Sequence, residues 1–272
     1  MMTKWPSGAS AVLCVAVHMD GPACEIGHGH APLGMRGGGR YAARRGIARC
    51  LDIFARQGVK ATFFMCGHDA ELYPDLMREV HRAGHEIAAH GYQHEDWELG
   101  DAEPELLERA HRILSNCVGE APVGWCSPSG YKSRLTLPTL KRLGYRYDTS
   151  EKDDDLPYLP EIEGVEARDF IMLPNNTTSL DDWPMYHQGQ GLPSELLANW
   201  IAELDALIAS GGYVHLIVHP RSDYGSGTPA RAAVVERFIV EALRWPGLQV
   251  VTLARLAEHC LAAPSQWRGE DK

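Results

Sequence analysis

Two histidines, His90 and His94, stand four residues apart, just after a short apolar stretch. An aspartate, Asp20, ends another stretch of the same kind. Imidazole and carboxylate groups suit zinc and related divalent ions, and a catalytic zinc site typically has three protein ligands and one position open to water. A bound ion can lower the pKa of that water from about 15.7 to about 7. These residue types predict a hydrolytic metal site with Asp20, His90 and His94 as ligands.

Chance pairing is the alternative for the two histidines, because 13 histidines in 272 residues produce some close pairs. The pair His85-Glu86 followed by His90 also imitates the HExxH helix of zinc proteases. The two histidines of that motif are four residues apart, whereas His85 and His90 are five apart. Five residues rotate the second imidazole off the shared helix face. The spacing therefore argues against a zinc protease of that class.

The composition is that of a globular enzyme, with 44% hydrophobic and 23% charged residues. The length of 272 residues is typical of an α/β barrel with one core, so we expect a single domain over residues 1–272. The net charge is −10 and the 26 basic residues form no long run. This charge pattern argues against a nucleic-acid partner and against an anionic membrane surface.

The early apolar run Ala11–Val17 is too short to span a membrane, and no small-residue cleavage signature follows it. It is interpreted as a buried strand. The seven cysteines are scattered and form no CxxC pair, and most are expected to be small apolar groups of the core or loops. Together these features predict a reducing, cytoplasmic location.

Short apolar runs alternate with longer amphipathic stretches along the chain, which favours a mostly parallel sheet, closed as a barrel or left open. The predicted strands are 11–17, 60–65, 86–89, 123–126, 146–148, 169–173, 212–218 and 248–253. The predicted helices are 45–57, 73–83, 104–117, 137–143, 193–210 and 230–245, with a short helix at the end.

Polar residues follow these strands at the points where chemistry is expected. Asp20, His90 and the segment Ser127–Gly130 each come after a predicted strand, and His219-Pro220 follows the strand that ends at Val218. In parallel α/β folds the functional residues gather at the carboxyl ends of strands. All these side chains are therefore expected on one rim of the sheet.

Several motifs in this order resemble the polysaccharide deacetylase (NodB-homology, carbohydrate esterase 4-like) family of metal-dependent amide hydrolases. The resemblance runs from about Val12 to Ile239. It rests on Ala61-Thr-Phe-Phe64, the pair His90 and His94, Gly144-Tyr-Arg-Tyr-Asp-Thr-Ser150, Asp182-Trp183-Pro184, and His219-Pro220 with Gly227-Thr-Pro-Ala-Arg231. The subgroup it resembles most has the basic segment 40–46 and the segment 181–184, and it includes allantoinase-like and cyclic-imidase-like hydrolases and enzymes named peptidoglycan deacetylases.

The resemblance implies a distorted α/β barrel, the (β/α) type of NodB-homology domains. It implies that Asp20, His90 and His94 hold zinc or a similar ion. His219 would protonate the leaving amine, Asp182 would orient it, and Trp183 would form a wall of the pocket. Relatives of this subgroup often assemble as symmetric oligomers, so a homo-oligomer is expected.

The chain departs from the family pattern at two linked positions. The catalytic-base aspartate is matched by His18, and the arginine that steadies this base is matched by Cys126. An unpaired buried ion would cost several kcal/mol. Because the acid and its counter-charge are lost together, neither is left unpaired. A neutral imidazole suits a general base, since its reference pKa is near 6.5. His18 is the candidate base; it could instead be a fourth metal ligand or a plain strand-end residue. Cys126 is interpreted as filling the space of the lost side chain.

The resulting hypothesis is hydrolysis of a carbon–nitrogen bond other than a peptide bond, with an oxyanion held by the metal and a backbone N–H near Ser129–Tyr131. Ser129, Tyr131 and Trp183 are the predicted substrate-binding residues. A cytoplasmic chain would meet small amides, cyclic imides or N-acyl compounds more readily than a cell-wall polymer. The alternatives are deacetylation of amino sugars in peptidoglycan or chitin fragments, and a metal-binding homologue with weakened turnover.

Overall fold

Eight strands form one parallel sheet within residues 3–96, 99–175, 179–187 and 191–267, which the computed structural model describes. The order is β10-β1-β2-β3-β4-β5-β8, and β9 pairs with the other edge of β1. The first half of β1 pairs with β10 and its second half with β2. The strands are β1 (Ala11–His18), β2 (Thr62–Met65), β3 (Glu86–Ala89), β4 (Gly124–Trp125), β5 (Tyr147–Asp148), β8 (Ile171–Met172), β9 (Tyr213–Val218) and β10 (Leu248–Val250).

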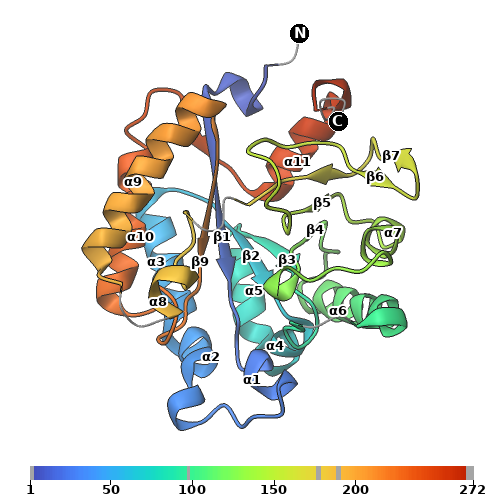
Figure 1. The fold of residues 1–272 in the computed structure, drawn as a ribbon. Helices are drawn as coiled ribbons and strands as arrows, with labels where there is room; N and C mark the ends of the chain where they lie inside the picture. Colours follow the sequence, from blue (N-terminus) through green and yellow to red (C-terminus); the bar gives the residue numbers. More distant parts are fainter. Residues whose placement is uncertain (1–2, 97–98, 176–178, 188–190, 268–272) are drawn as a thin grey trace.

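Helices surround this curled sheet, which confirms the expected distorted barrel (Figure 1). Among the described residues, no helix is long and apolar enough to cross a bilayer. A small antiparallel hairpin, β6 (Glu161–Ile162) and β7 (Val165–Glu166), lies outside the main sheet. The helices are α1 (Ala23–Gly27), α2 (Gly38–Tyr41), α3 (Ile47–Gln57), α4 (Gly67–Leu72), α5 (Pro74–Arg82), α6 (Glu103–Val118), α7 (Thr136–Arg142), α8 (Trp183–His187), α9 (Pro193–Ser210), α10 (Pro229–Ala242) and α11 (Leu253–Ala262).

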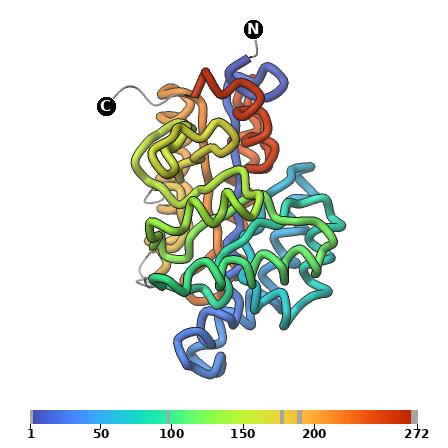
Figure 2. Tube along the Cα trace, turned by 90° about the vertical axis from the view of Figure 1, so that its right-hand side faces the viewer, coloured from blue at the N-terminus to red at the C-terminus, as the bar shows by residue number. Residues whose placement is uncertain are grey.

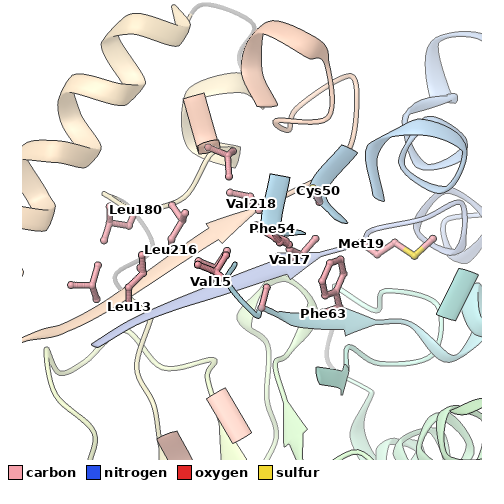
Figure 3. Close-up of a cluster of buried hydrophobic side chains, with 14 of the residues drawn as sticks. Leu13, Val15, Val17, Met19, Cys50, Phe54, Phe63, Leu180, Leu216 and Val218 are labelled. Carbon is pink, nitrogen blue, oxygen red and sulfur yellow. The ribbon is translucent and has the colours of Figure 1, made fainter. Parts of the chain in front are cut away.

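The core has two layers because β1 is buried on both faces, as central parallel strands are. Leu13, Val15 and Val17 pack with Phe54 of α3 in the layer between the sheet and its helices (Figure 3). The alternate residues of β1 belong to the cluster inside the curled sheet. This packing fixes the direction of β1 and therefore the position of the residues that follow it.

The predicted alternation is confirmed, and α9 coincides with the helix predicted over 193–210. Helix α10 ends at Ala242, three residues before the predicted end. Pro246 follows closely, and a proline disfavours helical geometry at the residue before it. The glycine-rich segment 27–39 leads into the short helix α2. The segment around α1 and α2 projects from the end of the molecule opposite α11 (Figures 1 and 2).

Candidate metal and hydrolytic site

A cavity of about 520 Å³ lies at the carboxyl ends of the strands. Asp20 comes from the loop after β1, His90 and His94 from the loop after β3, and His219 from the loop after β9. The structure therefore brings these residues to one rim, as the parallel topology requires. The other lining residues include His18, Cys24, Asp96, Cys126, Ser127, Ser129, Ser150, Lys152, Asn175, Asp181, Trp183, His187 and Tyr224.

Asp20, His90 and His94 form a compact group of possible ligands. One ligand atom from each lies within 4.8 Å of the other two. Oδ1 of Asp20 is 3.6 Å from Nε2 of His90 and 3.4 Å from Nε2 of His94. This oxygen is buried and has no hydrogen-bond partner. A buried carboxylate oxygen without a donor is costly, so the arrangement fits a cation held between these three side chains.

The hydrogen bond of His90 sets the orientation of its ring. Nδ1 of His90 lies 2.7 Å from the carbonyl oxygen of Cys126. A carbonyl oxygen can only accept a hydrogen bond. Nδ1 therefore carries the hydrogen, and the lone pair of Nε2 points toward Asp20. Metal-bound histidines are commonly fixed by such a hydrogen bond on their second nitrogen.

Charge in this group also favours a bound cation. Burial lowers the pKa of His90 to about 4, so its imidazole is neutral. Burial opposes ionisation of Asp20, yet the neighbouring His94 and the other histidines hold its pKa well below the usual range. Burial likewise opposes protonation of His94, but Asp20 raises its pKa well above the usual value. The group thus combines a neutral imidazole with a carboxylate whose ionised form is favoured, and both suit a bound cation.

His219 forms a buried pair with Asp182. Nδ1 of His219 lies 2.6 Å from Oδ1 of Asp182, which also accepts from the backbone N–H of His219. Oδ2 of Asp182 accepts from the backbone N–H of Ser226 at 2.7 Å. Burial opposes protonation of His219, but the charge and hydrogen bond of Asp182 raise the pKa of His219 to about 9. Nε2, on the other side of the ring, lies 3.7 Å from Oδ2 of Asp20.

Two of the three predicted substrate-binding residues line the cavity. Ser129 has a left-handed backbone, with φ of 55°. Trp183 is 42% exposed and stacks on His187 with 4.4 Å between the ring centroids. Tyr131 lies apart, in a separate small hollow beside Gly91.

Several known proteins are similar to this chain. The sequence model of the polysaccharide deacetylase family matches residues 41–147. A Helicobacter pylori peptidoglycan deacetylase is 28% identical over 257 residues, which are 82% of this chain and 86% of that protein. Residues 41–147 therefore form a polysaccharide deacetylase domain.

Solved structures of the family share the whole fold. A Mycobacterium smegmatis protein described as a polysaccharide deacetylase superposes with a TM-score of 0.88 and 29% identity, covering 99% of this chain and 96% of that one. The PuuE allantoinase superposes with a TM-score of 0.83 and 26% identity, covering 96% and 93% of the two chains. The deacetylase domain makes the protein a hydrolase of carbon–nitrogen bonds.

His18 and Cys126, where the chain departs from the family pattern, lie side by side at the cavity. A ring nitrogen of His18, the Cys126 sulfur and a ring nitrogen of His90 lie within 4.8 Å of one another. Nε2 of His18 is buried without a hydrogen-bond partner. Burial, His90 and His219 lower the pKa of His18 well below 6.5, and burial raises that of the Cys126 thiol to about 12. Both groups are therefore neutral, and His18 has a free lone pair.

Two residues that hold Asp20, Tyr224 and Arg221, were not predicted from the sequence. The hydroxyl of Tyr224 donates to Oδ2 of Asp20 at 2.8 Å, which leaves Oδ1 to face the histidines. The buried guanidinium of Arg221 donates to the backbone carbonyl of Asp20 at 2.5 Å and pairs with Glu25 and Asp223. Asp20 itself has φ of 41°, a conformation that needs such support in a residue other than glycine. The only signal in the sequence was their position just after His219.

Proposed function

We propose that the protein hydrolyses the carbon–nitrogen bond of a small amide, cyclic imide or N-acyl compound, with zinc as the expected ion. The observation that carries this proposal is the unpartnered Oδ1 of Asp20, which faces two imidazole nitrogens. His219, paired with Asp182, lies at the same cavity. A cation site beside a histidine–carboxylate pair is a combination that amide hydrolysis uses.

Asp20, His90 and His94 would hold the ion. When bound, the ion would polarise the scissile carbonyl and lower the pKa of a water molecule. The carbonyl of Cys126 keeps the hydrogen of His90 on Nδ1, and Tyr224 holds Oδ2 of Asp20. These outer contacts keep the ligand atoms in place without movement during the reaction.

His219 is proposed to protonate the leaving nitrogen. Asp182 keeps one proton on Nδ1 and favours the doubly protonated ring, so Nε2 can donate into the cavity. The developing oxyanion would meet the backbone near Ser129, which lines the same cavity. Trp183 forms an aromatic wall that would exclude water from one side of the substrate.

His18 is proposed to accept the proton of the attacking water. Its unpartnered Nε2 supports this role, and its neutral ring is able to accept a proton, while burial and the neighbouring histidines make it a weaker base than a free imidazole. For His18→Asp, which restores a carboxylate base, we expect retained metal and turnover within about 100-fold of the unmodified protein. His18→Ala, which removes the base, should lose about 10²- to 10⁴-fold with the metal still bound. Loss of metal from His18→Ala would instead identify His18 as a fourth ligand.

The cavity volume and the similar proteins indicate which substrates the site would accept. A cavity of about 520 Å³ accommodates a small molecule or one part of a longer chain. The structure of the PuuE allantoinase superposes on 96% of this chain, and this similarity supports a small substrate. The Helicobacter pylori peptidoglycan deacetylase supports the second candidate, deacetylation of an amino sugar.

A substrate panel with and without chelator tests the proposal. The purified protein would be analysed for bound metals and assayed on a cyclic imide, an N-acyl amino acid and N-acetylglucosamine oligomers. We expect turnover of a small amide or imide, its loss after chelation, and its recovery on adding zinc. Turnover of the oligomers alone would select the second candidate. Bound metal without turnover of any member would identify a binding homologue.

A further inference from the structure

We propose that the cavity recognises a carboxylate on the substrate through Lys152. This inference rests on the proposed function, since it names the class of amide that the site would accept. Lys152 lines the same cavity as Asp20 and His219. It is the one lysine or arginine among the described residues that line this cavity.

The ammonium group of Lys152 is free to bind an anion. Its one hydrogen bond among the described residues is a long one, 3.4 Å from Nζ to Oδ1 of Asn175. No described carboxylate lies within ion-pair distance of it, whereas Lys132 pairs with both Asp148 and Glu151. An ammonium has three donors, so at least two remain for a ligand.

The protein surface around Lys152 is already ordered. Asn175 is 4% exposed; its side-chain N–H donates to the carbonyl of Thr149, and its backbone N–H donates to that of Glu151. Ser150, which also lines the cavity, donates its hydroxyl and backbone N–H to Oδ1 of Asp148. A wall fixed by such contacts binds a ligand with little ordering cost.

The nearby carboxylates have other partners. Asp153 accepts from the hydroxyl of Tyr158 at 3.0 Å, and Asp154 accepts from the backbone N–H of Leu156 at 3.0 Å. Oδ1 of Asp181, in the cavity, accepts from the backbone N–H of Trp183 at 2.8 Å. None of these three carboxylates lies within ion-pair distance of Lys152, so a carboxylate on the ligand can form a charge-assisted hydrogen bond with its ammonium group.

The ammonium of Lys152 matches one negative charge on a ligand. Asp20, Asp96 and Asp181 line the same cavity, so a phosphate dianion placed at Lys152 would carry a second charge that this ammonium does not offset. A carboxylate matches the single charge and the small volume. The inferred substrate class is a carboxylate-bearing amide, such as an N-acyl amino acid, rather than a neutral sugar.

A matched pair of ligands tests this inference. N-acetylglycinate and N-acetylglycinamide have nearly the same shape and differ by one charge. Their binding to the metal-loaded protein would be measured by titration calorimetry, and kcat/KM where they turn over. We expect the carboxylate to bind about 10-fold more tightly, as for a hydrogen bond to a charged group, and this preference to shrink at high salt.

Lys152→Met should abolish the preference, because binding of the carboxylate should weaken more than binding of the carboxamide. Lys60→Met removes the same charge at the start of β2, the strand end remote from the cavity, and should keep the preference. A preference that survives in Lys152→Met would come from the ion or another group and would overturn the inference, as would equal binding of both ligands. Binding does not require turnover, so a protein that prefers the carboxylate but hydrolyses nothing would refute only the proposed function.

Discussion

Replacing His90 by alanine is expected to abolish metal binding and hydrolysis together. His90 supplies one of three grouped ligand atoms, and its loss leaves Asp20 and His94 as the only members of the set. Removing an outer contact of a metal ligand typically costs 10- to 100-fold in affinity, so loss of the ligand itself should cost more than about 100-fold. Metal analysis of the purified variant and a zinc titration would measure the first effect, and turnover the second.

His259→Ala is the matched control, because it removes an imidazole from α11, at the other end of the molecule. It should keep both metal and turnover. A His90→Ala protein that stays fully active without bound metal would refute the assignment of the ligands.

Replacing His219 by alanine is expected to reduce kcat by about 10²- to 10⁴-fold, the usual contribution of a general acid or base. The metal should stay bound, because His219 lies outside the group of Asp20, His90 and His94. This separation of metal content from turnover distinguishes a proton donor from a ligand. Steady-state kinetics and metal analysis of the same preparation would give both values.

His187→Ala serves as the control within the cavity. His187 lines the same space but stacks on Trp183, and it forms no ion pair with a carboxylate of the described residues. Its loss should change KM more than kcat. Unchanged kcat in His219→Ala would remove that residue from the proposed mechanism.

The fold was predictable because its strands and helices are regular and alternate. Parallel strands place their following loops on one edge, so Asp20, His90 and His219 could be expected together although about 200 positions separate the first from the last. Tyr131 shows the limit of this reasoning. Tyr131 lies two residues after Ser129, yet the turn at Pro128–Gly130 places it in the small hollow beside Gly91 instead of in the cavity.

Loop packing explains what the sequence could not show. Arg221 and Lys152 are both basic residues in loops, but Arg221 is buried beneath Asp20 and Lys152 faces the cavity. Periodicity carries no information about such positions, since it describes only which face of a regular element is buried. Their roles became visible only from contacts between residues remote in sequence, such as Arg221 with Glu25.

The anchoring of Asp20 by Arg221 has a wider consequence. Arg221 stands two residues after His219, so the same guanidinium ties the loop of Asp20 to the loop of His219. Neither loop can shift alone without breaking this tie. A mutational survey scored by activity alone would therefore rank Arg221 beside the reacting groups, even though it would never contact the substrate.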